Sequence, residues 1–265
     1  MEKNVLLTIE YDGSDFFGWQ RQPDRPTVQG YIERSLSSLF RREITINGTS
    51  RTDAGVHAYG QRASFKADIG IPEEKLALVI NNSLKRQGKN GDNLSPVRVT
   101  AAEEKPADFH ARFDAKGKKY IYRIKNSLTM NVFERNYVYH VSVPLNLEKM
   151  RAAAGYLKGV HDFKSFEASG GTPRETTIRN IFDIDIMAVP LADAGAENGW
   201  ERILEIHVSG DGFLYNMVRI ISGTLVDIGT GKIEAEMHDI ITAKDRSMAG
   251  HTAPPGGLYL AEVYY

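Results

Sequence analysis

Alternating apolar and polar positions predict strands along much of the chain, and apolar residues spaced by three or four positions predict helices between them. In the first part of the chain, one helix begins after Thr27, a typical N-cap residue, and another begins at Pro72. Strand patterns occur at 5–11, up to Gly48, from Ala63 and at 97–101. The order strand, helix, strand, strand, helix, strand is that of a ferredoxin-like split βαβ unit.

The same order of elements returns in the second part of the chain. Strands are predicted at 118–124, 176–187, 202–208 and 258–264, and helices at 147–157, 213–227 and 234–243. Residues 188–200 are rich in alanine, glycine and aspartate, which predicts a hairpin loop. We therefore predict an α+β fold with an N-terminal subdomain at 1–105 and a C-terminal subdomain at 106–265, each of ferredoxin-like order.

Composition excludes several classes of protein. With 42% hydrophobic and 25% charged residues, the chain of 265 residues is typical of a globular protein, and no apolar run reaches membrane-spanning length. The charged N-terminus has no secretory signal, so we expect a cytoplasmic protein without a membrane partner. The absence of cysteine excludes disulfides, thiolate nucleophiles and iron–sulfur clusters, and the seven histidines form no pair at metal-ligand spacing. We expect no metal site.

Charge is unevenly distributed along the sequence. The formal net charge of -1 does not predict a uniformly basic surface of the kind that binds nucleic acid. Residues 106–125 nevertheless contain six basic residues and only two acidic ones. A local basic patch attracts phosphates even on a neutral protein, although a solvated charged strand explains this segment equally well.

The stretch at 48–65, GTSRTDAGVHAYGQRASF, contains the candidate chemistry. Arg51 and Asp53 lie one residue apart in a glycine-rich loop between two predicted strands. An aspartate is ionised at neutral pH unless it is desolvated, and a guanidinium that folds back onto it would keep it so. The alternative is an ordinary Asx-turn, in which the carboxylate binds backbone groups and the arginine is solvated.

Several strings in this sequence, in this order, resemble the TruA-type family of tRNA pseudouridine synthase I. They cover nearly the whole chain: residues 48–65, EYDG at 10–13, GWQRQ at 18–22, DFHARF at 108–113, MVR at 217–219, AKDR at 243–246 and GLYL at 257–260. No single string is decisive, but chance does not readily give their combined order and spacing. The resemblance implies a pseudouridine synthase fold, in which two ferredoxin-like halves share an antiparallel sheet with helices packed on it.

The same resemblance implies a function. Members of this family are isomerases that convert uridine to pseudouridine in the anticodon stem-loop of tRNA, at positions 38, 39 and 40, without cofactor or metal. Asp53 matches the catalytic aspartate, which acts either as nucleophile at C1' of the ribose or as base at C2'. Tyr120, Arg51 and Arg219 match substrate-binding positions, and the family implies a homodimer.

Other basic residues are candidate RNA contacts, each with a structural alternative. Arg21 and Arg25 lie in a loop with Phe16, Phe17 and Trp19, where aromatic residues either stack on bases or close the core. Lys118, Lys119 and Arg123 alternate with Tyr120 and Tyr122, which share one face of the predicted strand. Tyr120 is expected to be partly exposed, with core packing as the alternative. Arg219 is expected beside a gap on its helix, or to extend its head group into solvent.

Three other functions stay open. The chain could modify other RNA sites within the same family, or bind RNA without catalysis. A glycoside hydrolase is disfavoured because Asp53 has no acidic companion within its motif.

The sequence also departs from the family after Asn81-Asn82-Ser83-Leu84, where it inserts a run with Lys85, Arg86 and Lys89 that could contact phosphate.

Overall fold

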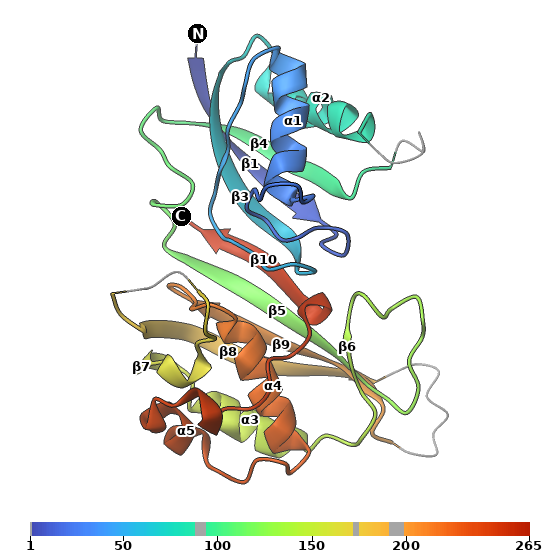
Figure 1. The fold of residues 1–265 in the computed structure, drawn as a ribbon, viewed down its shortest axis with the longest axis vertical. Coiled ribbons are helices and arrows are strands. Elements are labelled where there is room, and N and C mark those ends of the chain that lie inside the picture. The colour runs from blue at the N-terminus through green and yellow to red at the C-terminus, as the bar shows by residue number, and fades with distance from the viewer. Residues whose placement is uncertain (1, 88–93, 172–174, 191–198) are drawn as a thin grey trace. The chain divides into compact units, whose positions relative to one another are not determined.

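The computed structural model describes residues 2–87, 94–171, 175–190 and 199–265 (Figure 1). The chain forms two compact units, Met1–Lys116 with Leu260–Tyr265, and Gly117–Tyr259. Each unit combines helices with a mostly antiparallel sheet, which confirms the predicted α+β class. Most of the predicted hairpin loop, at 191–198, and the inserted run from 88 to 93 with Lys89 lie outside the described residues.

The first unit is built on the predicted split βαβ order. Its strands follow the order β4 (Val97–Lys105), β1 (Glu2–Tyr11), β3 (His57–Asp68) and β10 (Leu258–Tyr264). Helices α1 (Val28–Phe40) and α2 (Glu73–Lys85) pack against each other, and α2 also packs on β4 (Figure 1). The Thr27 hydroxyl accepts a hydrogen bond from Gly30 N at 3.3 Å, which confirms the predicted N-cap.

The strand predicted before the Asp53 loop is shorter than expected. Of residues 44–48, only Asn47 and Gly48, which form β2 (Asn47–Gly48), pair with β3, although Ile44 and Ile46 are both buried as their alternation predicts. Side chains of α1 bind the backbone there: Ile46 N donates to Glu33 Oε1 at 2.9 Å, and Ile44 N donates to a serine of the same helix. The alternation therefore reports burial under a helix and not strand pairing.

The second unit repeats the layered arrangement. Its strands follow the order β5 (Gly117–Asn126), β9 (Arg202–Gly210), β8 (Ile178–Pro190) and β7 (Gly159–Asp162), with β6 (Tyr139–Val141) parallel to β5. Helix α3 (Leu147–Gly155) packs on β8 and on α4 (Met217–Gly229), and α4 packs on β5; α5 (Met237–Ala243) follows along the chain. No described helix is long and apolar enough to cross a membrane.

Several details of the second unit differ from the predicted elements, among them the start of α5, which is at Met237 and not at 234. The short strands β6 and β7 were not predicted, because three or four residues are too few to display a periodic pattern. Helix α4 begins at Met217 and not at 213, since Asn216 has a left-handed backbone with φ of 59°. An L-residue in this conformation interrupts a right-handed helix.

Candidate active site

Asp53 lies in the loop between β2 and β3, where it is half-buried, while Arg51 is exposed. Between them, Thr52 is buried, and its hydroxyl makes a 2.8 Å hydrogen bond with the Tyr11 hydroxyl of β1. The Thr52 carbonyl accepts from Trp19 N at 3.0 Å, and the Asp53 carbonyl accepts from Val56 N at 3.2 Å in a tight turn. The backbone on both sides of the Asp53 carboxylate is therefore fixed.

Gln61 of β3 holds the start of the same loop. Its side chain is fully buried and binds Ser50 twice: Nε2 donates to Ser50 O at 2.7 Å, and Oε1 accepts from Ser50 N at 3.2 Å. A buried amide whose donor and acceptor are both used fixes the backbone that it binds. The loop thus leaves β2 in one conformation, and a preorganised carboxylate is what catalysis requires.

The loop at 12–26 packs against the backbone of the Asp53 loop, and glycines at two positions permit the close approach. Gly18 has φ of +85°, and a Cβ there would lie 2.5 Å from Thr52 O. A Cβ on Gly13 would lie 2.0 Å from Val56 O. Phe16 and Trp19 are buried, so the alternative in which these two rings close the core is the one observed. The GWQRQ string therefore braces the candidate catalytic loop.

The two arginines of this loop are held in different ways. Arg21 Nε lies 3.2 Å from the buried carboxylate of Glu33, which orients its exposed guanidinium. The Arg25 guanidinium lies 4.7 Å from the centre of the exposed Phe17 ring, in a cation–π contact. Both groups remain candidate RNA contacts, and the Arg25–Phe17 pair presents a cationic, aromatic surface that suits a base or a phosphate.

Tyr120 is less exposed than the sequence indicates. Only 7% of its surface is exposed, and its ring packs edge-on against Phe213 with centroids 5.2 Å apart. Tyr122 lies on the same face of β5, as predicted, and is fully buried; its hydroxyl donates to Pro254 O at 2.7 Å. Burial raises the pKa of the Tyr122 phenol well above its ordinary value, so this hydroxyl stays protonated and acts as a donor. The expectation of a partly exposed Tyr120 is wrong because Phe213 covers its ring.

Arg219, in the first turn of α4, is half-buried. Its Nε donates to Ala253 O at 2.8 Å, and Nη1 donates to Asn216 Oδ1 at 2.8 Å. The expected gap beside it is filled by backbone: a Cβ on Gly223 would lie 1.9 Å from His251 O. Arg219 is thus a fixed group and does not extend freely into solvent.

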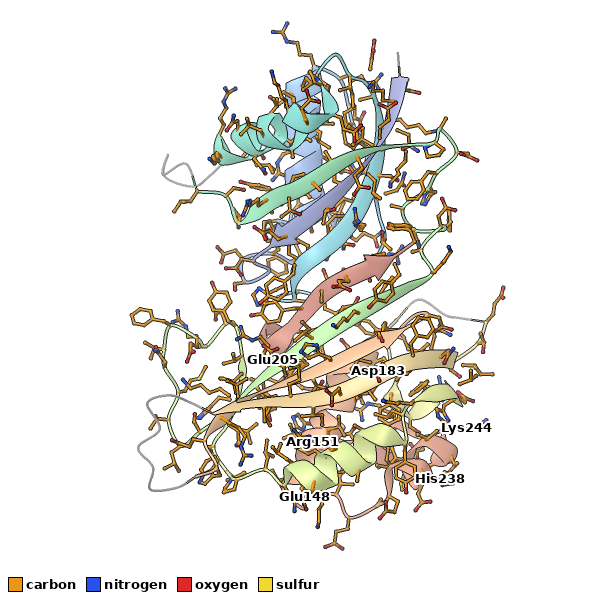
Figure 2. All side chains as sticks on the ribbon, turned by 180° about the vertical axis from the view of Figure 1, so that it is seen from behind. Glu148, Arg151, Asp183, Glu205, His238 and Lys244 are labelled. Atoms are coloured by element: carbon orange, nitrogen blue, oxygen red, sulfur yellow. The ribbon has the colours of Figure 1, made fainter. Side chains whose placement is uncertain are left out.

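The basic residues of β5 do not form one uniform patch. Lys118, Lys119 and Arg123 are half-buried, and alternation along the strand places Lys119 and Arg123 on the face opposite Tyr120. Arg123 Nε lies 3.1 Å from Glu205 Oε1 of β9, on the sheet face visible in Figure 2, and its guanidinium lies over the Tyr259 ring. An ion pair weakens the attraction of Arg123 for phosphate, so the local charge is smaller than the sequence indicates.

The part of the chain that the structure describes contains no group of three or more His, Asp or Glu side chains arranged to hold a metal ion. The candidate residues for the chemistry stay those that the sequence predicts, Asp53 and Arg51 in the first unit and Tyr120 and Arg219 in the second. Sequence reasoning named these four through the resemblance, after their spacing had singled out Arg51 and Asp53. It missed the groups that contact them or the neighbouring residues Ser50 and Thr52, namely Tyr11, Gln61, Phe213 and Ala253. Sequence spacing gives no signal for the contacting residues, because each of them reaches its partner only in the folded protein.

Comparison with known proteins tests the resemblance. A family model described as tRNA pseudouridine synthase matches residues 7–114 and 153–265. The tRNA pseudouridine synthase A of Ruminiclostridium cellulolyticum is 45% identical over 264 residues, covering 99% of this chain and 100% of that protein. The tRNA pseudouridine synthase A 2 of Clostridium tetani is 42% identical over 268 residues, covering 100% of both chains. The tRNA pseudouridine synthase A of Acetivibrio thermocellus is 42% identical over 264 residues, covering 99% of this chain and 100% of that protein. The chain belongs to the tRNA pseudouridine synthase family.

Proposed function

We propose that this protein converts uridine to pseudouridine at positions 38, 39 and 40 in the anticodon stem-loop of tRNA, with Asp53 acting at the ribose. Family membership makes the chain an isomerase that acts on tRNA. The positions in tRNA and the role of Asp53 are the proposed part. The observation that carries it is the half-buried Asp53 in a loop whose preceding residues, Ser50 and Thr52, are hydrogen-bonded to Gln61 and Trp19.

The reaction breaks the bond between N1 and C1' of one uridine, rotates the freed base and forms a bond between C5 and C1'. The proton on C5 leaves and N1 gains one, so nothing is added to or taken from the nucleotide overall. The Asp53 carboxylate either attacks C1', or removes the C2' proton and later returns it. Both routes need one ionised carboxylate held at the ribose, and neither needs a cofactor.

The proposal gives Asp53 the catalytic role and gives Arg51, Tyr120 and Arg219 substrate-binding roles. The arginines orient the carboxylate, bind a nearby phosphate, or do both. A uridine in a stem must leave its stack before its ribose can react, at a cost of a few kcal/mol. Tyr120 is proposed to contact the extruded base with its ring edge or hydroxyl. We also propose that the protein acts in the cytoplasm as a homodimer whose halves share the tRNA.

A turnover assay tests this function directly. Purified protein is incubated with a tRNA transcript in monovalent salt with a chelator, and pseudouridine is mapped along the product. Conversion confined to positions 38–40 is expected. Binding without conversion would favour a non-catalytic RNA-binding module, and conversion elsewhere would favour another site specificity within the family. Loss of conversion on chelation, with binding intact, would contradict a metal-free mechanism.

Tyr120→Ala is expected to lower both stability and turnover, because its ring is buried against Phe213. Truncating a buried aromatic residue costs about 3–5 kcal/mol of unfolding free energy. Tyr120→Phe keeps the ring and removes only the hydroxyl, so it is expected to melt close to the parent while losing part of its turnover. Thermal melting and turnover are measured on both variants. An unchanged melting temperature for Tyr120→Ala would contradict the observed packing.

Reversing charge at Lys118 and Lys119 is expected to weaken tRNA binding and to flatten its salt dependence. Each phosphate contact that is lost lowers the slope of log affinity against log salt by about one unit. Lys75→Glu combined with Lys149→Glu, at exposed lysines of α2 and α3, makes the same change in net charge and is expected to keep the parent slope. Arg123, paired with Glu205, is expected to contribute less. An unchanged slope in the double variant would make this segment a solvated strand.

A further inference from the structure

The segment at 250–254 lies unusually close to helix α4. A Cβ on Gly223 would lie 1.9 Å from His251 O, and a Cβ on Gly250 would lie 2.6 Å from Asp227 Oδ2 and 2.7 Å from Thr224 Cα. Gly250 N also donates to the Thr224 hydroxyl at 2.9 Å. Two backbones in such contact can adopt only one register, so any group bound to this segment has a fixed position relative to α4.

A buried carboxylate anchors the start of this segment. Asp227 of α4 is 5% exposed, and its Oδ2 accepts from His251 N at 3.0 Å and contacts His251 Nδ1 at 2.9 Å. Its Oδ1 lies 3.6 Å from Lys232 Nζ. Burial alone would raise the pKa of the Asp227 carboxyl, but the hydrogen bonds and charge of His251, with Lys232, outweigh it and lower this pKa. Asp227 is therefore ionised at neutral pH.

The His251 imidazole links Asp227 to a third element, strand β6. An ionised carboxylate can only accept, so His251 Nδ1 carries a hydrogen and donates to Asp227. His251 Nε2 lies 3.1 Å from the hydroxyl of Tyr139 on β6, within hydrogen-bond distance. Burial, with the nearby Asp227 charge, raises the pKa of the Tyr139 phenol, which keeps this hydroxyl protonated. Helix α4, the segment and β6 are joined in one chain of hydrogen bonds.

The other end of the segment holds Arg219. Ala253 O accepts from Arg219 Nε at 2.8 Å, and Ala253 N donates to Arg219 O at 3.1 Å. The next residue, Pro254, accepts from the Tyr122 hydroxyl at 2.7 Å. The guanidinium of Arg219 is thus fixed by a carbonyl two residues beyond His251, on a segment that Asp227 anchors.

We propose that Asp227, His251 and Tyr139 are positioning residues for the reaction: they fix the Arg219 guanidinium through the segment at 250–254 and do not touch the uridine. This inference rests on the role proposed above for Arg219. A buried ion pair contributes little net stability compared with apolar packing of the same volume, so stability alone does not explain it. Directional hydrogen bonds instead specify one arrangement, and a displacement of about 1 Å can cost a hundredfold in rate.

A double-mutant cycle tests the proposal. Asp227→Asn keeps the shape of the side chain, but a neutral amide replaces the carboxylate that accepts hydrogen bonds from His251 N and His251 Nδ1. In the parent, we expect kcat/KM for tRNA to fall about tenfold; in an Arg219→Ala background, we expect less than about a twofold fall, because the effect passes through Arg219. Ser165→Ala is the control: it also removes a buried polar group, whose hydroxyl donates to Ile240 O of α5 at 2.6 Å and not to the segment at 250–254. We expect it to change kcat/KM by the same factor in both backgrounds.

The outcomes separate this inference from the proposed function. Equal losses for Asp227→Asn in both backgrounds, as for Ser165→Ala, would overturn it and make Asp227 purely structural. Full turnover by Arg219→Ala alone would also overturn it, while leaving Asp53 and the synthase activity in place. No conversion of tRNA by the parent would reject the proposed function itself. If Asp227→Asn does not fold, Tyr139→Phe replaces it in the cycle, because it removes only one hydroxyl. We expect it to lower kcat/KM about threefold in the parent, on the order of the loss of a single hydrogen bond. We expect no change in the Arg219→Ala background. Equal losses again overturn the proposal.

Discussion

Asp53→Asn is expected to abolish pseudouridine formation and to leave tRNA binding intact or tighter. The amide is nearly isosteric with the carboxylate, but it can neither attack C1' nor take up the C2' proton. Acid–base or nucleophilic groups contribute at least about 10²-fold to rate, so turnover falls by that factor or more. Binding is kept because a negative charge near phosphates is removed. Single-turnover conversion and tRNA affinity are measured on the same preparation.

Asp24→Asn is the matched control for this variant. Asp24 is exposed in the loop at 12–26, and its left-handed backbone, with φ of 56°, is one that asparagine tolerates well. It removes the same charge from the same unit, and it is expected to turn over at the parent rate. If Asp53→Asn binds normally and converts uridine within tenfold of the parent, about 1.4 kcal/mol of barrier, Asp53 is structural.

Gly18→Ala is expected to destabilise the first unit and to impair turnover together. Its φ of +85° costs an L-residue about 1–2 kcal/mol, and the new Cβ would lie 2.5 Å from Thr52 O, the carbonyl that Trp19 binds. Relief of that contact displaces the backbone next to Asp53, at a further cost of about 1–3 kcal/mol. Urea unfolding and turnover at a temperature where the variant is folded measure the two effects.

Gly70→Ala separates this effect from the general consequence of replacing a glycine. A Cβ at Gly70 has no heavy atom within 4 Å, so this variant is expected within about 0.5 kcal/mol of the parent, at full turnover. Were Gly18→Ala to lose stability but keep parent turnover at a temperature where it is folded, the loop at 12–26 would not position Asp53.

The sequence predicted what depends on local pattern. The long helices and strands, the Thr27 cap and the face shared by Tyr120 and Tyr122 all follow from periodicity and capping chemistry. The segment around Ile46 has the same alternation but is not a strand, because side chains of α1 bind its backbone. Periodicity reports which side chains are buried, and it does not identify the partner that buries them.

The groups that hold the candidate site could not be predicted, because they meet only through the fold. Tyr139, Asp227 and His251 lie far apart in sequence, and none carries a local signal. The burial of Tyr120 depends in the same way on Phe213, which follows another strand. The last strand belongs mostly to the first unit, from Leu260 onward, although it follows the second in sequence. Contacts of such separation are set by tertiary packing, which a single sequence does not display.

The most direct measurement is a pseudouridine map of tRNA from cells that carry the parent gene, no gene, or the gene for Asp53→Asn. The account predicts pseudouridine at positions 38, 39 and 40 with the parent, and none there without the gene or with the variant, although the variant protein is present and folded. Modification of these uridines by Asp53→Asn at the parent level would contradict the central claim, as would changes only at sites outside the anticodon stem-loop.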